Sequence, residues 1–330
     1  MKVVITGGVG FVGLMLARRL VGLSDLAVGK DGRDRIDEIE LLDVAVPAQR
    51  PRGLDQRVRL TAGDMADRAA VARLIDRPDI GIFHLAAIPS GGGEQDFDLA
   101  MQANLTGQLN LLEAARQTGS CPRLTFASTI AVFGGPDMPA EVGDTTKQTP
   151  QTTYGMTKAA GELLVNDYSR RGFIDGRSAR LPTVIIRPGK PNKAASSFAS
   201  GVFREPLNGV ACELPVGLDT IMPISGYRTI VDGFVRLYEA PGASLGVDRA
   251  INFPALAVSV GEMVESLRRV AADRPLGTIS VKRDPVIERI VATWPIKLNF
   301  ERALKLGLPQ DPDLDSIVRA YIADFLAPQQ

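Results

Sequence analysis

The stretch "KVVITGGVGFVG" (residues 2–13) decides the fold of this chain. It begins with a short β-branched run, which is typical of a buried strand. The run leads directly into Gly7, Gly10 and Gly13 and then into the helical pattern of residues 11–23. Glycines at such positions permit positive φ angles and let a pyrophosphate approach the N–H groups at the helix start. Strand, loop and helix together predict a dinucleotide-binding loop.

Short apolar strands alternate with helical stretches over the first 190 residues. This alternation predicts an α/β fold of the Rossmann type, a doubly wound parallel sheet covered on both faces. We expect a dinucleotide-binding domain at residues 1–190, with 229–253 returning to it, and a smaller α/β substrate-binding lobe at 191–330. The strands after the first are predicted at 39–44, 58–64, 80–87, 123–129 and 182–189, and helices at 67–75, 95–118, 157–171, 229–240, 260–272 and near the C-terminus.

Composition excludes several classes of function. The 330 residues carry 38 basic and 38 acidic side chains, so no net charge attracts nucleic acid or an anionic membrane. One histidine and two cysteines cannot supply a Cys/His zinc site, and we predict no metal. The N-terminus does not resemble a signal peptide, and no apolar run approaches the ~18–20 residues that span a bilayer. We therefore expect a cytoplasmic protein that acts on a small molecule.

Two acidic residues could select the dinucleotide. Asp43 ends the second predicted strand, where a carboxylate accepts hydrogen bonds from the adenosine ribose and repels a 2′-phosphate, so NAD is favoured over NADP. It lies farther along than the usual spacing of about 20 residues, and residues 24–38 are therefore predicted to be an insertion. Asp64 could reach the adenine, cap the helix at 65–75, or do both.

Tyr154 and Lys158, in "TTYGMTK" (152–158), lie one helical turn apart. A nearby ammonium favours the phenolate and lowers the pKa of a tyrosine, which could then accept a proton from a substrate alcohol. Ser128 and Thr129 follow the fifth predicted strand, where a hydroxyl can hold the substrate oxygen. These residues predict a proton-transfer site. The single histidine, His84, lies within an apolar strand and is interpreted as structural.

Seven segments carry a family resemblance, in order along the first lobe: "TGGVGFVG" (6–13), "GDM" (63–65), "FHLAA" (83–87), "NLTGQLNLLEAAR" (104–116), "FASTIAVFG" (126–134), "YGMTK" (154–158) and "RPG" (187–189). On these segments the chain resembles the extended short-chain dehydrogenases/reductases, in the NAD-dependent epimerase/dehydratase branch. The resemblance implies that Tyr154 is the general base, that Lys158 also binds the nicotinamide ribose, and that Thr129 is the catalytic hydroxyl with Ser128 beside it. Phe133 departs from the pattern, which usually has a tyrosine there.

The same resemblance implies a set of NAD contacts and a homodimer that pairs through the helices at 95–118 and around Tyr154. The implied cofactor-binding residues are Gly7, Gly10, Phe11, Val12, Gly13, Asp43, Asp64, Met65, Ala86, Ala87, Asn104, Tyr154, Lys158 and Pro188.

Residues 152–183 and 181–209 resemble, more narrowly, the D-erythronate dehydrogenases. This implies NAD-dependent oxidation at C2 of a four-carbon sugar acid, D-erythronate, to 2-dehydro-D-erythronate. The candidate substrate residues are Ser90, Thr129, Tyr154, Asn192, Lys193 and Arg228. The basic loop after Gly189 could contact a carboxylate or simply be solvated, and the glycines that follow Ser90 suggest a mobile flap.

Two alternatives stay open. A nucleotide-sugar epimerase or dehydratase would use the same machinery, but the segment "ISGYRTIVDGF" (224–234) lacks the "RDYIHV" pattern common in that group. A non-catalytic dinucleotide sensor on this fold often loses the tyrosine or the lysine, and both are present here. Production of NADH from a sugar acid would separate the dehydrogenase from both alternatives.

Overall fold

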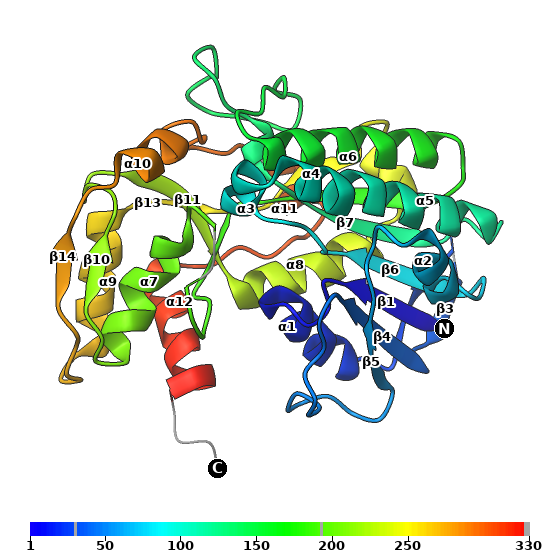
Figure 1. Cartoon of the computed structure of the whole chain (residues 1–330), viewed down its shortest axis with the longest axis horizontal. Helices are drawn as coiled ribbons and strands as arrows, with labels where there is room; N and C mark the ends of the chain where they lie inside the picture. Colours follow the sequence, from blue (N-terminus) through cyan, green and yellow to red (C-terminus); the bar gives the residue numbers. More distant parts are fainter. Residues whose placement is uncertain (30–31, 192–193, 327–330) are drawn as a thin grey trace.

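The main sheet has seven strands, and all neighbouring pairs are parallel (Figure 1). A computed structural model describes residues 1–29, 32–191 and 194–326. The strand order is β12-β8-β7-β6-β1-β4-β5, and helices cover both faces, which confirms the predicted Rossmann-type fold. The strands are β1 (Lys2–Thr6), β4 (Glu38–Asp43), β5 (Val58–Ala62), β6 (Ile80–His84), β7 (Arg123–Thr129), β8 (Asp175–Leu181) and β12 (Ala250–Asn252).

The sixth strand of this sheet differs from the sequence prediction. It is β8, whereas the predicted segment 182–189 contributes only β9 (Thr183–Ile185), which pairs with β11 (Ile221–Gly226) in a second sheet. Strand β8 has the sequence "DGRSARL" and does not look apolar. Its two arginines are buried because each guanidinium has partners: Arg177 donates to the carbonyl of Ala240, and Arg180 pairs with Glu162.

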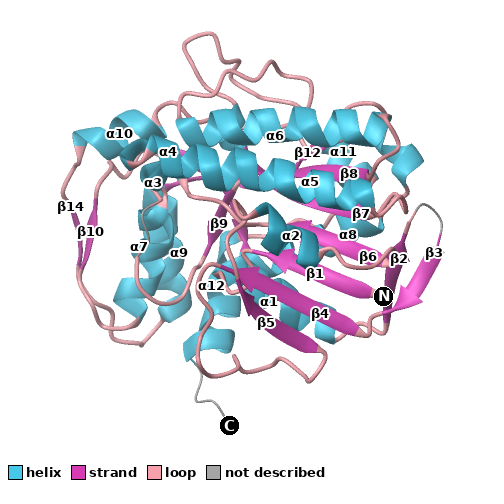
Figure 2. Cartoon of the chain, turned by 45° about the vertical axis from the view of Figure 1, so that its right-hand side comes forward, coloured by secondary structure: helices cyan, strands magenta, loops and turns pink. Residues whose placement is uncertain are grey.

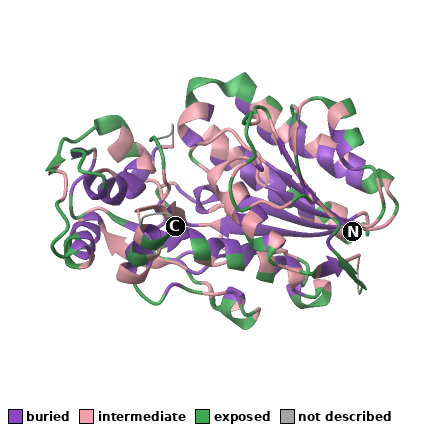
Figure 3. Ribbon diagram, turned by 90° about the horizontal axis from the view of Figure 1, so that it is seen from below, coloured by how far each residue is buried: buried purple, intermediate pink, exposed green. Residues whose placement is uncertain are grey.

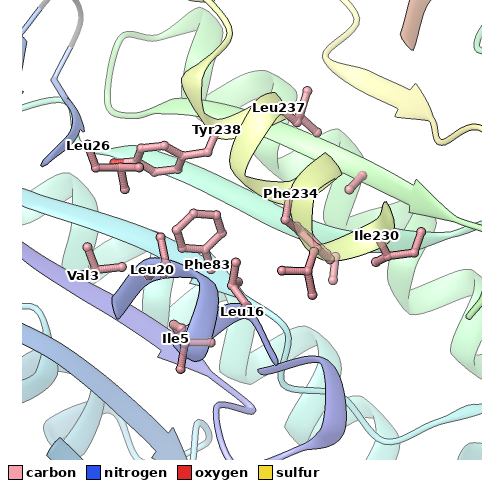
Figure 4. Close-up of a cluster of buried hydrophobic side chains, with 14 of the residues drawn as sticks. Val3, Ile5, Leu16, Leu20, Leu26, Phe83, Ile230, Phe234, Leu237 and Tyr238 are labelled. Atoms are coloured by element: carbon pink, nitrogen blue, oxygen red, sulfur yellow. The ribbon is translucent and has the colours of Figure 1, made fainter. Parts of the chain in front are cut away.

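Helices lie on both faces of the sheet (Figure 2), and a hydrophobic layer on each face holds them there. On one face, α1 (Phe11–Val21) and α8 (Tyr227–Glu239) pack side by side and bury a cluster in which the rings of Phe83 and Tyr238 stack with their centroids 4.8 Å apart (Figure 4). On the other face lie α2 (Arg68–Leu74), α5 (Gly107–Gln117) and α6 (Thr153–Arg170). Figure 3 shows the strands buried between these layers and the outer helix faces exposed.

The helix predicted at 95–118 is divided into shorter elements. They are α3 (Ser90–Gln95), α4 (Phe97–Ala100), a π-helical segment (Met101–Thr106) and then α5. Asp96 breaks the run and caps α4, since its side chain accepts a hydrogen bond from the N–H of Leu99. The glycines after Ser90 lie within α3, so the structure shows a helix where the sequence suggested a flap.

A smaller lobe, on the left of Figure 1, follows the main sheet and has its own core. The sheet β13-β11-β9 and the pair β10-β14 are covered by helices that present apolar faces to them. Its further elements are α7 (Ser197–Leu207), β10 (Cys212–Leu214), β13 (Leu256–Ser259), α9 (Val260–Ala271), β14 (Ile279–Val281), α10 (Pro285–Val291), α12 (Leu314–Tyr321) and a π-helical segment (Ile322–Leu326).

The remaining elements are short. The predicted insertion before β4 forms an antiparallel hairpin of β2 (Asp25–Val28) and β3 (Gly32–Arg35). Helix α11 (Glu301–Lys305) and the 3₁₀ segments Ile130–Val132 and Gly242–Leu245 complete the chain. Across the described residues, no helix combines the length and apolar character that a membrane crossing requires.

Candidate active site

The strand order reverses between β1 and β6, because the chain passes from β1 to β4 on one side and β6 lies on the other. In open α/β sheets, ligands bind in the crevice that forms at such a switch point, beyond the carboxyl ends of the strands. A cavity of about 300 Å³ lies there. Its walls include Gly7, Gly10, Phe11, Val12 and Gly13 from the loop after β1, and Leu85 and Ala87 after β6.

The glycine loop fits a dinucleotide because side chains would fill it. Gly7 has a φ of +67°, and a Cβ atom there would lie 2.8 Å from the backbone nitrogen of Ala86. A Cβ atom on Gly13 would lie 2.5 Å from the carbonyl oxygen of Gly7. The start of α1 carries no side-chain cap at Gly10. Its first N–H groups therefore remain available to an anion at the positive end of the helix.

Asp43 lies at the carboxyl end of β4, beside the glycine loop. One carboxylate oxygen accepts a hydrogen bond from the backbone N–H of Val9 at 3.2 Å, which ties the side chain to the loop. A carboxylate in this position favours a free ribose over a 2′-phosphate.

Asp64 does not cap the following helix. Its side chain accepts from the N–H of Ala66, whereas Asp67 is the N-cap of α2 and accepts from Ala69 and Ala70. The cap predicted at Asp64 is wrong, because α2 begins at Arg68, close to the predicted helix at 67–75 and too far along the chain for Asp64 to cap it. Met65 is buried and packs against Gly107 of α5.

Asn104 holds the segment after β6 in place. Its side-chain amide pairs with both the N–H and the carbonyl of Ile88, at 2.7 and 3.1 Å, and also donates to Thr157 of α6. The N–H of Ala86 donates to the hydroxyl of Thr6 on β1. Pro188 is not among the residues that line the cavity.

Tyr154, Lys158 and Thr129 all line the cavity. Thr152 caps α6 by accepting from the N–H of Gly155, so Tyr154 and Lys158 both lie in the helix, one turn apart. The hydroxyl of Thr129 acts on the phenol of Tyr154 and lowers its pKa. The amine of Lys158 donates to the carbonyl of Ala127 at 2.7 Å and lies 5.8 Å from the centroid of the Tyr154 ring. The structure thus brings the predicted trio together.

Burial dominates the electrostatics of this trio. It raises the pKa of Tyr154 to about 12, while the hydrogen bond from Thr129 acts in the opposite direction. Burial also lowers the pKa of Lys158 to about 7, against the effect of Glu162, which raises it. The expected lowering of the Tyr154 pKa by Lys158 stays a prediction. In the chain alone, burial makes the phenol a weaker acid than a free tyrosine, so less of it is phenolate at a given pH.

Ser128 lies on the other side of β7 from Thr129, as alternation along a strand requires. Its hydroxyl donates to the buried carboxylate of Glu162 rather than to Tyr154. Phe133 is buried and the guanidinium of Arg180 stacks on its ring at 5.1 Å, so the position taken by a tyrosine in related sequences is apolar here.

His84 is a buried residue of β6. Its Nδ1 atom is hydrogen-bonded to the hydroxyl of Thr6 at 2.6 Å, and burial lowers the pKa of its side chain to about 3. The ring is therefore neutral at physiological pH and fixes β6 to β1 next to the cofactor loop. This agrees with the structural role expected from the sequence.

The far wall of the cavity comes from the smaller lobe and includes an arginine that sequence reasoning missed. Arg187 lines the cavity, and within the described residues its guanidinium has no carboxylate partner. Its backbone is held on both sides: its N–H donates to Ser200, and its carbonyl accepts from Arg204. Burial and the neighbouring Arg204 lower the pKa of Arg187. Thr183, Ser196, Ser197, Ser200 and Trp294 also line this wall, and Ser90 lines the cavity from the start of α3.

Arg228, proposed from the sequence as a substrate contact, is not brought to this cavity. It lies on α8 and pairs with Asp324 near the C-terminal end of the described chain, in a different surface hollow. Asn192 and Lys193, the other basic-loop candidates, lie outside the described residues.

Comparisons with known proteins agree with this geometry. Residues 3–244 match the model of the NAD dependent epimerase/dehydratase family. The chain is 47% identical to a D-erythronate dehydrogenase of Cupriavidus necator over 98% of both chains, and 40% identical to one of Haemophilus influenzae over 98% of this chain and 99% of the relative. A crystal structure described as a nucleoside-diphosphate-sugar epimerase from Agrobacterium tumefaciens is 37% identical, covers 100% of this chain with 95% of its own, and has a TM-score of 0.90.

The chain therefore belongs to the NAD-dependent epimerase/dehydratase family, because the match extends over more than half of its length. It is an enzyme of the oxidoreductase class, and its cofactor is NAD. Most of the first lobe and, apart from Trp294, the residues that line the cavity fall within the matched residues.

Proposed function

We propose that this enzyme oxidises the C2 hydroxyl of a small sugar acid, with D-erythronate giving 2-dehydro-D-erythronate as the first substrate to test. The observation that carries the proposal is Arg187, a cation without a carboxylate partner among the described residues, in the same cavity as Tyr154 and Thr129. A planar guanidinium binds a carboxylate through two hydrogen bonds and fixes its orientation. The hydroxyls of α7 beside it suit a substrate that carries several hydroxyl groups.

The chemistry divides between the two walls. When bound, NAD supplies the acceptor for the hydride that leaves C2, together with a positively charged ring. Thr129 orients the substrate oxygen, and Tyr154 takes the hydroxyl proton as the carbonyl forms. The positive charge of Lys158 favours the phenolate form of Tyr154. Arg187 holds the carboxylate next to C2, so the carbon that loses hydride is fixed relative to Tyr154.

Two further elements of the proposal concern the cofactor and the assembly. The glycine loop and Asp43 would hold the pyrophosphate and the adenosine ribose of NAD. Three large apolar side chains, Phe97, Leu99 and Leu163, are exposed on the neighbouring helices α4 and α6. Exposed apolar side chains on neighbouring helices are typical of interaction sites, and we propose that a second copy of the chain covers them in a homodimer.

NADH formation from a panel of four- to six-carbon sugar acids tests the substrate. We expect absorbance from D-erythronate with NAD and much less with NADP. The epimerase structure from Agrobacterium tumefaciens makes nucleotide-sugar epimerisation the second candidate. Interconversion of nucleotide sugars without net NADH, together with no oxidation of any sugar acid, would contradict the proposal.

A further inference from the structure

Helix α6 and the end of strand β7 are joined by three contacts of consecutive strand residues. The carbonyl of Ala127 accepts from Lys158, the hydroxyl of Ser128 donates to Glu162, and the hydroxyl of Thr129 acts on the phenol of Tyr154 and lowers its pKa. Tyr154, Lys158 and Glu162 are spaced by four residues and therefore lie on one face of α6. Two of these contacts involve the proposed proton-transfer groups Tyr154 and Lys158, whereas the contact between Ser128 and Glu162 involves neither.

The contact between Ser128 and Glu162 has the most hydrogen-bond partners. Both oxygens of Glu162 accept from Nε of Arg180 at 3.0 Å, and Nη2 of Arg180 donates to Oε2 at 2.7 Å. The side chain of Gln148 donates to the same oxygen. The side chains of Glu162 and Arg180 are only 2% and 3% exposed. Such a pair is strongly destabilised when one partner is removed, because the other is left as an unpaired buried charge.

Glu162 also fixes the segment that leads into α6. Gln148 belongs to this segment, and Arg180 donates through Nη1 to the carbonyl of Asp144 at 2.7 Å. One carboxylate therefore links β7, β8 and the approach to Tyr154.

We infer that Glu162 is a positioning residue for the reaction: with Arg180 and Ser128 it sets the register of α6 on β7 and so holds Tyr154 and Lys158 against Thr129 and Ala127. This inference rests on the proposed function of Tyr154 and Lys158. Groups that must hold a reacting atom within a fraction of an ångström need such support from buried neighbours.

Glu162 also acts on the charge of Lys158. The polar groups that face the amine are Tyr154 and Glu162 on α6, His84 on β6 and the carbonyl of Ala127 on β7, while Arg180 on β8 acts through Glu162. His84 is neutral, so Glu162 supplies the negative charge. Since Glu162 raises the pKa of Lys158, removing its charge must lower that pKa, and Lys158 must lose its proton at a lower pH.

The test is Glu162→Gln, with Asp167→Asn as the matched control. Asp167 is a carboxylate on the same helix that pairs with Arg170 on the exposed surface. In Glu162→Gln we expect kcat to fall by about tenfold or more, as for a misplaced reacting group. The alkaline limb of kcat/KM should move to lower pH, and NADH affinity should stay within about threefold. Asp167→Asn should resemble the wild type, as surface changes usually do.

Ser128→Ala provides a second route, since it removes one link and leaves the ion pair intact. A double-mutant cycle decides its meaning: if Ser128 acts through Glu162 the two effects are non-additive, and if Ser128 touches substrate directly they add. A kcat for Glu162→Gln close to the wild-type value, an unmoved alkaline limb, or additive effects would each overturn the inference.

The proposed function can fail separately. Variants are compared with whichever sugar acid the wild type oxidises, so a different substrate leaves the test intact. If the wild type oxidises none, the pH dependence of NADH binding still reports the charge of Lys158. Trp294, the single tryptophan and a residue of the cavity wall, provides that signal by energy transfer to NADH. An identical pH dependence in Glu162→Gln would then contradict the inference.

Discussion

The two walls of the active-site cavity are built in different ways. The wall formed by β7 and α6 depends on short spacings: a strand end, a helix cap at Thr152, and side chains one turn apart. The opposite wall shows no such local pattern: the backbone of Arg187 is held by Ser200 and Arg204 of α7, and Trp294, more than a hundred residues further on, lines the same cavity. The difference teaches that the proton-transfer groups can be predicted from sequence patterns, whereas the substrate-binding groups are brought together only in the folded chain.

Tyr154→Phe should have the largest effect, a loss of catalysis at the β7–α6 wall. Losing the phenolic oxygen removes the proton acceptor, and general base catalysis contributes about 10²–10⁴-fold to rate. We expect kcat to fall by that factor while NADH affinity, measured from Trp294 fluorescence, changes little. Retention of near-normal turnover would show that another group accepts the proton.

Arg187→Met addresses the opposite wall. The loss of a charged hydrogen bond to a carboxylate should raise KM for the sugar acid by about 10- to 100-fold, with a much smaller effect on kcat. Arg228→Met is the matched comparison, because this arginine pairs with Asp324 outside the cavity and should leave KM unchanged. If KM rose in Arg228→Met and not in Arg187→Met, the carboxylate would instead be bound by Arg228, the residue suggested by the sequence. Because Tyr154 and Arg187 share no polar partner among the described residues, the effects of Tyr154→Phe and Arg187→Met should add.

The same contrast explains which parts of the site could be predicted from the sequence. The glycine loop, Asp43, Tyr154, Lys158 and Thr129 could be found because backbone sterics and helix periodicity fix them locally. Strand β8 was misplaced because its arginines are neutralised by Asp175, Glu162 and backbone carbonyls that only the folded chain brings together. Arg187 lay within the recognised "RPG" segment, yet it was not considered as a ligand, because the misplaced strand put it in the main sheet instead of in the wall from the smaller lobe.

Ser128 illustrates a further limit. Sequence reasoning placed two adjacent hydroxyls near the substrate, and both residues line the cavity, but alternation along the strand sends their side chains to opposite faces. Thr129 acts on the phenol of Tyr154, whereas the hydroxyl of Ser128 donates to Glu162, a residue that the sequence analysis did not single out. The signal was available: Glu162 continues the four-residue spacing of Tyr154 and Lys158 along the helix.

Thr129→Val should have a smaller, pH-dependent effect within the β7–α6 wall. The hydrogen bond from Thr129 lowers the pKa of Tyr154, so its removal raises that pKa. Tyr154 acts as a base only after it loses its proton, and the acid limb of the pH–rate profile should therefore move upward by about 0.4–1 pH unit. Thr125→Val, on the same face of β7, is the control, because its hydroxyl is buried without a partner in the described part of the chain. A profile that does not move would mean that Thr129 leaves the phenol unaffected.

Leu163→Glu should have the smallest effect on catalysis and tests whether the wall that carries Tyr154 depends on a partner. The side chain is 66% exposed on α6, on the surface we propose to be covered in a homodimer. A buried charge at a dimer interface is costly, so the variant should shift toward monomer in sedimentation velocity. Leu218→Glu, at an exposed site of the smaller lobe, should keep the wild-type assembly. If Leu163→Glu is monomeric with kcat within about twofold of the wild type, α6 is held by its own contacts to β7, as the Glu162 network suggests. A large loss of kcat in the monomer would instead make the partner subunit part of the support for Tyr154. The wall with Arg187 would then depend on the smaller lobe of the same chain, and the wall with Tyr154 on the second chain.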